Sequence, residues 1–532
     1  MADSKREIER KYETTTETRL PDLSRVAGVF TVAHRGVTEL DAVYYDTEDL
    51  RLAADSLTLR RRTGGSDAGW HLKFPVASGI RDELREPLSD TLPRSFAGML
   101  RSRVRESGLV PVVRLVSARD VHHLLDADGA LLAEVSVDRV RAERLTGGGA
   151  TAAWTEIEAE LADDGDPAFL DAVEHRLRKA GIHPSASPSK LSRALAETEP
   201  ERKKGPAGRE KGPAGSEKTG REESSGGSGK GPAGRTRRPT AGDHVLAYIR
   251  HQRAAIVALD PAVRRDLPDS VHQLRVATRR LRSALRTFRR ILDRDVTDPV
   301  GAELKWLAAE LGIDRDQEVL DARLRSGLDA LPRTLVLGPV RGRLRIWSVS
   351  GRNGARRRTV AVLDGKRYLA LLESLDALLA DPPLLPDASH APGRALPRAV
   401  LKEYGRLAAR AGRALELPPG HDRDVAVHEA RKAAKRVRYA AEAARPALGK
   451  PAKRFAKRMK AVQSLLGDHQ DSVVAREALR TLAVQAHAAG EPAFTWGLLY
   501  GREEAIAAAQ ERELPEVWKR ASRPRLRAAL EG

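Results

Sequence analysis

The first residues with the types and spacing to do chemistry stand at the start of the chain, in Glu7-Ile8-Glu9-Arg10-Lys11. Side chains along a β-strand point to alternate faces, so Glu7, Glu9 and Lys11 would share one face and Ile8 and Arg10 the other. A strand against an apolar core would alternate apolar and polar residues, whereas here the uniform face is charged. The pattern predicts a strand that lines a polar, ion-filled cavity.

Further segments of the first 200 residues repeat this charged alternation. The side chains that would share a strand face are Arg60 and Arg62; His71 and Lys73; Arg81, Glu83 and Arg85; Glu134 and Asp138; and Glu156, Glu158 and Glu160. If the strands close into a barrel, carboxylates line one side of the interior and basic groups another. Carboxylates bind hard divalent cations and basic groups bind phosphoryl oxygens, so the layout suits a polyphosphate chain with a divalent metal. The alternative, an exposed charged sheet face, fits any one strand but weakens when six strands share the pattern.

The elements that carry these faces are short runs of β-forming residues separated by Gly-rich turns. The runs span residues 42–47, 56–62, 69–74, 131–138 and 154–161, and helices are expected near 94–107, 167–180 and 189–197. The pair His122-His123 is expected in a loop or strand without a function of its own. The N-terminal half is therefore predicted to be an α+β domain dominated by antiparallel strands.

The second half of the chain changes to a helical period and contains an internal repeat. Residues 271–282, VHQLRVATRRLR, align with residues 427–438, VHEARKAAKRVR, and each copy is followed by a Leu-Gly-x-x-x-Asp sequence, ending at Asp316 or Asp471. Positions i, i+3, i+7 and i+10 of each copy fall on one helix face, which holds His272, Arg275, Arg279 and Arg282 in the first and His428, Arg431, Lys435 and Arg438 in the second. Arg280, Lys432 and Arg436 broaden the two basic faces.

A face of like charges repels itself unless an anion or an acid neutralises it, so the repeat predicts a track for a polyanion. Two alternatives are a solvated basic face and an internal salt-bridge network with Asp316 and Asp471. Metal chelation by His272 and His428 fits the spacing less well, because neither has a second histidine at i, i+4. Few aromatic residues are interleaved with basic ones, which argues against a nucleic-acid partner.

Charge and composition divide the chain into three parts. The whole chain has a formal net charge of +19, but residues 1–200 hold 28 basic and 34 acidic residues, and residues 241–532 hold 54 and 35. We predict domains at 1–198 and 241–522, the latter in halves of about 241–380 and 398–522, joined by a disordered Gly-, Pro- and Lys-rich linker over 199–240. The absence of cysteine excludes disulfides and thiolate metal sites, and the absence of a long apolar run predicts a cytoplasmic protein with no membrane partner.

The N-terminal motifs together resemble the CYTH domain of the triphosphate tunnel metalloenzymes. The resemblance covers about residues 5–197 and rests on Glu7-x-Glu9-x-Lys11, Tyr-Tyr-Asp-Thr at 44–47, Leu-Arg-Arg-Arg at 59–62, Trp-His-Leu-Lys at 70–73, Glu-Ile-Glu-Ala-Glu-Leu at 156–161 and Ser-Lys-Leu-Ser-Arg at 189–193. It implies an eight-stranded antiparallel tunnel that hydrolyses the terminal phosphoryl group of a triphosphate with Mg²⁺ or Mn²⁺.

This resemblance also implies roles for individual residues. The implied metal ligands are Glu7, Glu9, Glu158, Glu160 and Asp138, with Glu156 as a further candidate. The implied phosphate ligands are Lys11, Arg60, Arg62, Lys73, Arg85, Arg114 and Lys190, with Arg81 and Arg119 as further candidates. Glu83 and Glu134 would be additional acids of the tunnel, and the implied catalytic set is Glu7, Glu9, Lys11, Arg60, Arg62, Lys73, Glu83, Glu158 and Glu160. Which acid activates water stays open.

The helical half resembles the CHAD domain, an all-α module of two related helical bundles. The match spans about residues 241–520 and rests on the two repeated basic faces. It implies binding of long-chain inorganic polyphosphate, and association with polyphosphate granules, through His272, Arg275, Arg279, Arg280, Arg282, His428, Arg431, Lys432, Lys435, Arg436 and Arg438.

Together these expectations describe a metal-dependent inorganic triphosphatase with a polyphosphate-binding helical domain. Tripolyphosphate is the expected substrate, and a nucleoside or thiamine triphosphate, hydrolysed or cyclised, is the alternative within the enzyme class. A non-catalytic polyphosphate-binding protein is the alternative outside it. The acid pairs Glu7/Glu9 and Glu158/Glu160 favour an enzyme, because a pure anion binder gains little from burying carboxylates.

Overall fold

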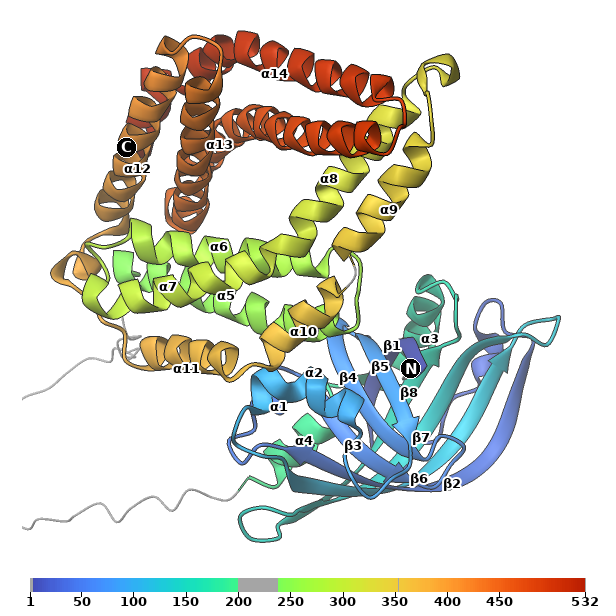
Figure 1. Ribbon diagram of the computed structural model, residues 1–532. Helices are drawn as coiled ribbons and strands as arrows, with labels where there is room; N and C mark the ends of the chain where they lie inside the picture. The colour runs from blue at the N-terminus through green and yellow to red at the C-terminus, as the bar shows by residue number, and fades with distance from the viewer. Residues whose placement is uncertain (1–2, 200–237, 353, 532) are drawn as a thin grey trace, which may run out of the picture. The chain divides into compact units, whose positions relative to one another are not determined.

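The structure is a computed structural model that describes residues 3–199, 238–352 and 354–531 of the chain. The described residues form two compact units, one N-terminal and one C-terminal (Figure 1). Residues 200–237, most of the predicted linker, lie outside the described residues. In the described part of the chain, no helix combines the length and the hydropathy that crossing a membrane requires.

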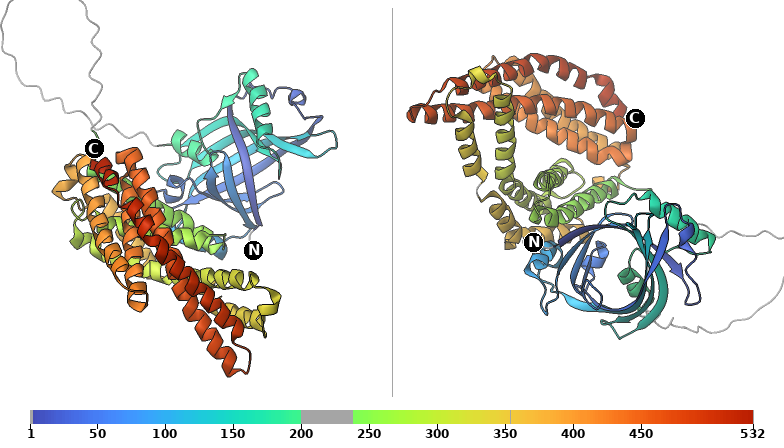
Figure 2. Two further views of the ribbon diagram at one scale, coloured as in Figure 1. Left: turned by 90° about the horizontal axis from the view of Figure 1, so that it is seen from above. Right: turned by 90° about the vertical axis from the view of Figure 1, so that its right-hand side faces the viewer.

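The N-terminal unit contains a ring of eight antiparallel strands, which confirms the predicted fold. The strands are β1 (Asp3–Thr14), β2 (Thr31–Asp46), β3 (Thr58–Thr63), β4 (Gly69–Ala77), β5 (Ile80–Pro87), β6 (Val110–Leu125), β7 (Leu131–Arg144) and β8 (Thr151–Leu161). They pair in the order β5-β4-β3-β2-β6-β7-β8-β1, and pairing of β1 with β5 closes the ring (Figure 2). A two-residue strand, β9 (His183–Pro184), pairs with the end of β1 on the edge opposite to β8.

Alternation along β1 and β8 separates a charged inner face from an apolar outer face. Across β1 and β8, Glu9 pairs with Glu160 and Lys11 with Glu158, so the charged faces of the two strands meet inside the ring. The opposite faces pack against α3 (Ala168–Lys179), and Ile157 is among the buried residues of that cluster. One local property of the sequence, the period of two, therefore builds both the cavity and the outer core.

Helix α4 (Lys190–Glu197) brings the last predicted site residue into the ring. Its N-cap is Ser189, whose hydroxyl accepts a hydrogen bond from the Ser192 amide. Leu191 and Ala194 pack on residues of β6, β7 and β8. Because the helix starts at the cavity, Lys190 in its first turn projects among the acids of the tunnel. Two further helices, α1 (Arg51–Ala54) and α2 (Arg94–Val104), pack against each other.

Strands β2 and β6 are the longest of the ring and the least visible in the sequence. Only residues 42–47 predicted β2, and no run predicted β6 as a whole. A bulge between His34 and Gly36 interrupts the alternation of β2, and a second irregularity follows at Tyr44 and Tyr45. A bulge shifts the pattern by one residue, so a strict period of two cannot be followed through it.

The C-terminal unit is helical, as predicted. Its helices are α5 (Ala241–Arg264), α6 (Ser270–Thr287), α7 (Arg294–Glu310), α8 (Gly312–Asp329), α9 (Val340–Arg352), α10 (Ala355–Asp364), α11 (Lys366–Ala380), α12 (Pro392–Glu416), α13 (His421–Ala488), α14 (Phe494–Ala521) and α15 (Pro524–Glu531). Helix α13 is two helical segments joined at Gly449, where φ is 60° and ψ is −130°. The first repeat motif lies in α6 and the second in the first segment of α13, and residues from both helices enter one hydrophobic core.

Candidate active site and basic cluster

The interior of the β ring holds a small, almost entirely charged cavity. Its lining includes the acids Glu7, Glu9, Glu158 and Glu160 and the cations Lys11, Arg60, Arg62, Lys73, Arg81, Arg85, Arg119 and Lys190. These residues come from six strands and from α4. The free volume is only about 70 Å³, because side chains that pair with one another fill much of the interior.

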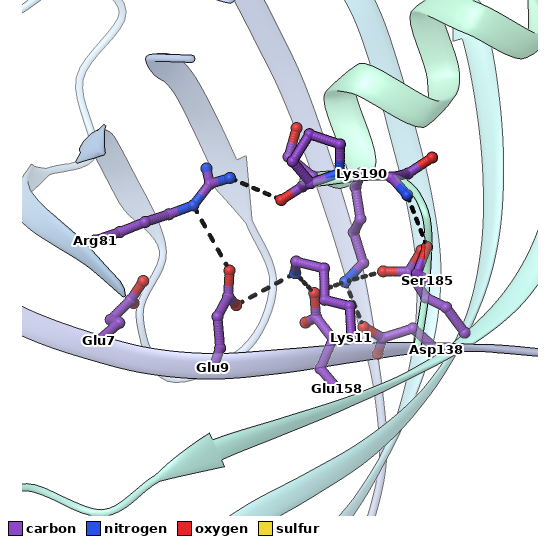
Figure 3. A network of polar contacts seen from close by, with 12 residues as sticks. Glu7, Glu9, Lys11, Arg81, Asp138, Glu158, Ser185 and Lys190 are labelled. Atoms are coloured by element: carbon purple, nitrogen blue, oxygen red, sulfur yellow. Dashed lines mark hydrogen bonds and ion pairs between the residues drawn. The ribbon is translucent and has the colours of Figure 1, made fainter. Parts of the chain in front are cut away.

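One part of this network is a group of three buried acids. Asp138, Glu156 and Glu158 offer carboxylate oxygens that all lie within 4.8 Å of one another. The ammonium of Lys190 lies among them, 2.8 Å from Asp138, 2.9 Å from Glu156 and 2.5 Å from Glu158 (Figure 3). Lys11 forms a second ion pair with Glu158. Two ammonium groups therefore hold together carboxylates that would otherwise repel one another.

A second part of the network surrounds Glu7, which is 3% exposed. Lys73 Nζ lies 2.5 Å from one of its carboxylate oxygens, and the Arg85 guanidinium lies 3.6 Å from the other. The same two cations contact the fully buried Glu83, at 3.3 Å from Lys73 and 2.5 Å from Arg85. Each cation is thus shared between two acids.

Burial and neighbouring charges act in opposite directions on the protonation of these groups. Burial raises the pKa of Glu7 to about 7, although Lys73 opposes the shift. Burial also disfavours the charged form of Glu158, but Lys11 and Lys190 more than offset it and hold the pKa of Glu158 well below its ordinary value. The pKa of Lys190 is raised, because its acid neighbours outweigh the effect of burial. Glu158 and Lys190 are therefore both charged at neutral pH.

The arginines of the cavity differ in how well they are paired. Arg119 makes a bidentate contact with Asp138, at 2.8 and 2.7 Å. Arg62 pairs with Asp67, yet burial together with Arg60 and Arg119 lowers the pKa of Arg62 to about 9. A guanidinium that is buried beside two others is stabilised by any additional anion. The Arg62 side of the cavity is therefore suited to bind one.

Two of the predicted tunnel residues, Arg114 and Glu134, form no ion pair with the side chains that line the cavity. Arg114 lies on β6 and donates two hydrogen bonds to Asp41, at 3.0 and 2.6 Å, with a side chain that is 47% exposed. Arg119 of the same strand faces inward, and Arg114 lies five positions before it, an odd offset, so Arg114 faces outward. Glu134 does not line the cavity and lies 3.3 Å from His123 Nε2.

Sequence reasoning missed Tyr44 and Asp67. The Tyr44 hydroxyl accepts a hydrogen bond from Arg60 at 3.4 Å, and Asp67 is the ion-pair partner of Arg62. Tyr44 stands in the Tyr-Tyr-Asp-Thr motif, so the motif combined with strand alternation could have identified it. Asp67 lies in the turn between β3 and β4, where no periodicity indicates the direction of a side chain.

In the helical unit, the two predicted basic faces meet. Helix α6 contacts α13, and burial together with the charges of Arg431 and Arg279 lowers the pKa of Lys435 to about 7. Burial also lowers the pKa of Arg279. Neither Arg279 nor Lys435 forms an ion pair with any residue that the structure describes. We call Arg275, Arg279, Arg431 and Lys435 the basic cluster.

Internal acids neutralise the other two members of the basic cluster. Arg275 lies 3.1 Å from Asp316, and Arg431 lies 3.3 Å from Asp471. These are the ion pairs of the salt-bridge alternative considered from the sequence. The two cations of each repeat therefore differ: one forms an ion pair with an acid, and the other forms none with any described residue.

The glycines of the two Leu-Gly-x-x-x-Asp sequences lie against the arginines, and only the first makes room for its arginine. A Cβ atom at Gly312 would lie 2.8 Å from the Arg275 guanidinium, and one at Gly467 would lie 3.5 Å from that of Arg431. The repeated sequence thus supplies an acid partner for one arginine in each copy, and in the first copy its glycine also supplies space.

The remaining predicted residues of the basic faces surround the cluster. Arg280 and Arg438 contact Glu442 at 3.2 and 3.3 Å, and both lie over the Tyr439 ring. Arg436 lies 3.3 Å from Glu403 and Lys432 lies 2.7 Å from Glu429, while His272, Arg282 and His428 are half-buried on the same helices.

Comparison with known proteins identifies both units. The CYTH domain profile matches residues 5–195 and the CHAD domain profile matches residues 247–480. Among solved structures, the chain is similar to PptA from Streptomyces chartreusis (22% identity, 53% of this chain and 100% of that chain, TM-score 0.46). It is also similar to the CHAD domain from Ricinus communis (26% identity, 55% of this chain and 92% of that chain, TM-score 0.41). A further similar structure is the putative adenylyl cyclase HpAC1 from Hippeastrum, described as having a dominant triphosphatase activity (20% identity, 36% of this chain and 95% of that chain, TM-score 0.23).

Two full-length relatives extend the match to nearly the whole chain. They are the uncharacterised proteins MT2285 and Rv2226 from two strains of Mycobacterium tuberculosis, each 37% identical over 522 residues, which cover 94% of this chain and 93% of the relative. The chain therefore belongs to the same family as these mycobacterial proteins and carries a CYTH domain followed by a CHAD domain.

Proposed function

We propose that the N-terminal unit is a metal-dependent triphosphatase and that tripolyphosphate is its substrate. The observation that carries the proposal is the cavity itself, where buried carboxylates and buried cations neutralise one another. Burying such ions costs several kcal/mol each and gains little for folding. A triphosphate with its metal offers every one of these groups a new partner, so the cost is consistent with a functional site.

Substrate binding would exchange partners within the network. Phosphoryl oxygens would take Lys11, Lys73 and Lys190 from their carboxylates, and the released carboxylates would become ligands of Mg²⁺ or Mn²⁺. The proposed metal ligands are Glu7, Glu9, Glu158, Glu160 and Asp138, and Glu156 joins them because its oxygens lie close to those of Asp138 and Glu158. An all-carboxylate set suits both ions, and a bound ion would neutralise charge on the phosphoryl oxygens.

The cations of the chain would stabilise the transition state. Arg60, Arg62 and Arg85 surround the cavity together with the three lysines, so they would contact phosphoryl oxygens on several sides. Hydrogen bonds from guanidinium donors strengthen as negative charge grows on the leaving oxygen. Loss of one such donor should cost about 3 kcal/mol in the transition state, by analogy with other preorganised donors.

The lining favours an inorganic chain over a nucleoside or thiamine triphosphate. Apart from Leu191, every lining residue carries a charge or a hydroxyl group, and Tyr44 is the one aromatic residue of the lining. Sites for organic ligands are usually lined mainly by apolar and aromatic side chains that cover the ligand. The cavity offers little such surface for a base or a thiamine ring.

Phosphate release tests the proposal. The full chain would be assayed with tripolyphosphate, long-chain polyphosphate and ATP, each with Mg²⁺, Mn²⁺ or EDTA. We expect metal-dependent release, fastest from tripolyphosphate, that the Glu7→Ala/Glu9→Ala variant loses. Glu48→Ala/Asp49→Ala removes two exposed acids of the same unit and is the matched control. No release from any substrate by the wild type would contradict an enzyme and leave a binding protein.

For the helical unit, we infer that the basic cluster binds long-chain inorganic polyphosphate. Arg279 and Lys435 are half-buried and form no ion pair with any described residue, and the pKa of each is lowered, so a phosphate chain would supply negative charge that stabilises both cations. Arg279→Ala/Lys435→Ala should weaken the binding of labelled polyphosphate to the full chain. The variant Arg341→Ala/Arg345→Ala on α9 removes the same charge from an exposed site, and an equal loss there would contradict a specific cluster.

A further inference from the structure

A second group of side chains that can bind a metal lies apart from the tunnel, on strands β2 and β6. His34 Nε2 lies 2.7 Å from Asp120 Oδ1, and His122 Nε2 lies 3.5 Å from the same oxygen. The two imidazole ring centres are 5.0 Å apart. One ligand atom from each of the three residues lies within 4.8 Å of the other two. Both histidines therefore direct a nitrogen toward one carboxylate.

Strand register explains why the three side chains meet. His34 of β2 lies directly opposite His122 of β6, and Asp120 comes two residues before His122 on the same face of its strand. Arg119 points into the tunnel, so Asp120 and His122 point outward. A bulge lies between His34 and Gly36, and Gly36 has a φ of 91°. Bulges commonly redirect a side chain, and this one lies beside the histidine pair.

The charge environment of this group differs from that of the tunnel. In the tunnel, carboxylates contact ammonium and guanidinium groups. The ion-pair partners of Asp120 in the described part of the chain are the two imidazoles, which bind metal ions in their neutral form. The side chain of His34 is 57% exposed, so an ion can reach the group from solvent.

We propose that His34, Asp120 and His122 bind one divalent transition-metal ion of the class of Zn²⁺, Co²⁺ or Ni²⁺. Two imidazoles and one carboxylate suit these ions, whereas the all-carboxylate set of the tunnel suits Mg²⁺ and Mn²⁺. Metal bonds of about 2.0–2.1 Å in a tetrahedral site separate the ligand atoms by roughly 3.3 Å, so small side-chain rotations complete the geometry. Solvent fills the remaining position, and the ion joins β2 to β6 from outside the ring.

Metal titration of the full chain tests this site. The protein would be prepared without a polyhistidine tag, stripped with a chelator and held in excess Mg²⁺ to occupy the carboxylates of the tunnel. Co²⁺ binding would be followed by its visible absorption and Zn²⁺ binding by calorimetry. We expect one Zn²⁺ per chain, and we expect His34→Ala and His122→Ala each to weaken binding by on the order of 100-fold.

The adjacent histidine provides the matched control. His123 faces Glu134 on the other side of β6, so His123→Ala should keep wild-type affinity. The Glu7→Ala/Glu9→Ala variant should also keep it, because the site is separate from the tunnel. The proposal is overturned if the wild type binds no Zn²⁺ in the presence of excess Mg²⁺. It is also overturned if His34→Ala and His122→Ala bind Zn²⁺ with wild-type affinity, or if either control variant loses Zn²⁺ binding as these two variants do. Circular dichroism of each variant confirms that it is folded.

Discussion

Replacing Lys190 by methionine removes one charge from the tunnel and keeps most of the side chain. The Lys190 ammonium lies 2.8, 2.9 and 2.5 Å from Asp138, Glu156 and Glu158, and the side chain is 11% exposed. Removing one partner from a buried ion group typically costs 3–5 kcal/mol, because the remaining charges lose their compensation. Arg119 still contacts Asp138 and Glu158 in the variant. We therefore expect the free energy of unfolding, measured without metal, to fall by about 3 kcal/mol, the lower end of that range.

A divalent ion should reverse much of this loss. In the wild type the ion must displace the ammonium of Lys190, whereas in the variant it meets three carboxylates without that competitor. A ligand present at about 100 times its Kd stabilises the folded state by roughly 2.7 kcal/mol. We therefore expect Mg²⁺ to stabilise Lys190→Met by about 2–3 kcal/mol more than the wild type. Triphosphatase activity should still fall by about 100-fold, because a phosphate ligand is lost.

Hydrogen exchange of peptides from β8, in EDTA and in Mg²⁺, measures the stability of the ring separately from that of the helical unit. The indole of Trp154 donates a hydrogen bond of 2.6 Å to Glu156, so its fluorescence is a second local readout. Lys179→Met, at the exposed end of α3, is the control and should change stability by less than about 0.5 kcal/mol.

Two results would refute this reasoning. If the free energy of unfolding of Lys190→Met in EDTA is less than about 1 kcal/mol below that of the wild type, Lys190 does not compensate buried charge at this position. If Mg²⁺ stabilises the variant no more than the wild type, the acids around Lys190 are not where the ion binds.

The affinity for polyphosphate should fall by up to about tenfold per pH unit between pH 7 and about 9. Lys435 has a pKa of about 7, and a bound anion raises that pKa, so binding above pH 7 requires Lys435 to take up a proton. Lys435→Arg stays charged and should flatten this dependence in a titration of affinity against pH. Gly312→Ala should lower the free energy of unfolding of the helical unit by about 1 kcal/mol, since its Cβ displaces Arg275, whereas Gly467→Ala should raise it by about 0.5 kcal/mol; urea unfolding distinguishes the signs. Arg114→Ala should leave kcat/KM for tripolyphosphate within about twofold of the wild-type value, and a hundredfold loss would contradict its position outside the cavity.

The sequence by itself determined which side chains share a face. Glu7, Glu9 and Lys11 alternate with Ile8 and Arg10, so they point the same way in any strand. The helical faces that begin at residues 272 and 428 follow from the helical period in the same way. These patterns are local, because the geometry of a strand or helix depends only on neighbouring residues. Together with the family resemblance, they were enough for the two fold classes.

Only the tertiary structure decided which of these faces meet and which charges pair. Arg114 and Arg119 are both basic residues of β6, and strand register alone turns the second inward and the first outward to Asp41. Lys190 joins acids that lie more than 30 residues away along the chain.

The same holds for the helical repeat, where Arg279 and Lys435 come together from helices far apart in the sequence. The sequence left a polyanion track and an internal salt-bridge network as alternatives. In the fold, Arg275 pairs with Asp316, as the salt-bridge alternative predicts, while Lys435 forms no ion pair with any described residue. Electrostatic energies depend on distance and burial, and both are established only when the chain folds.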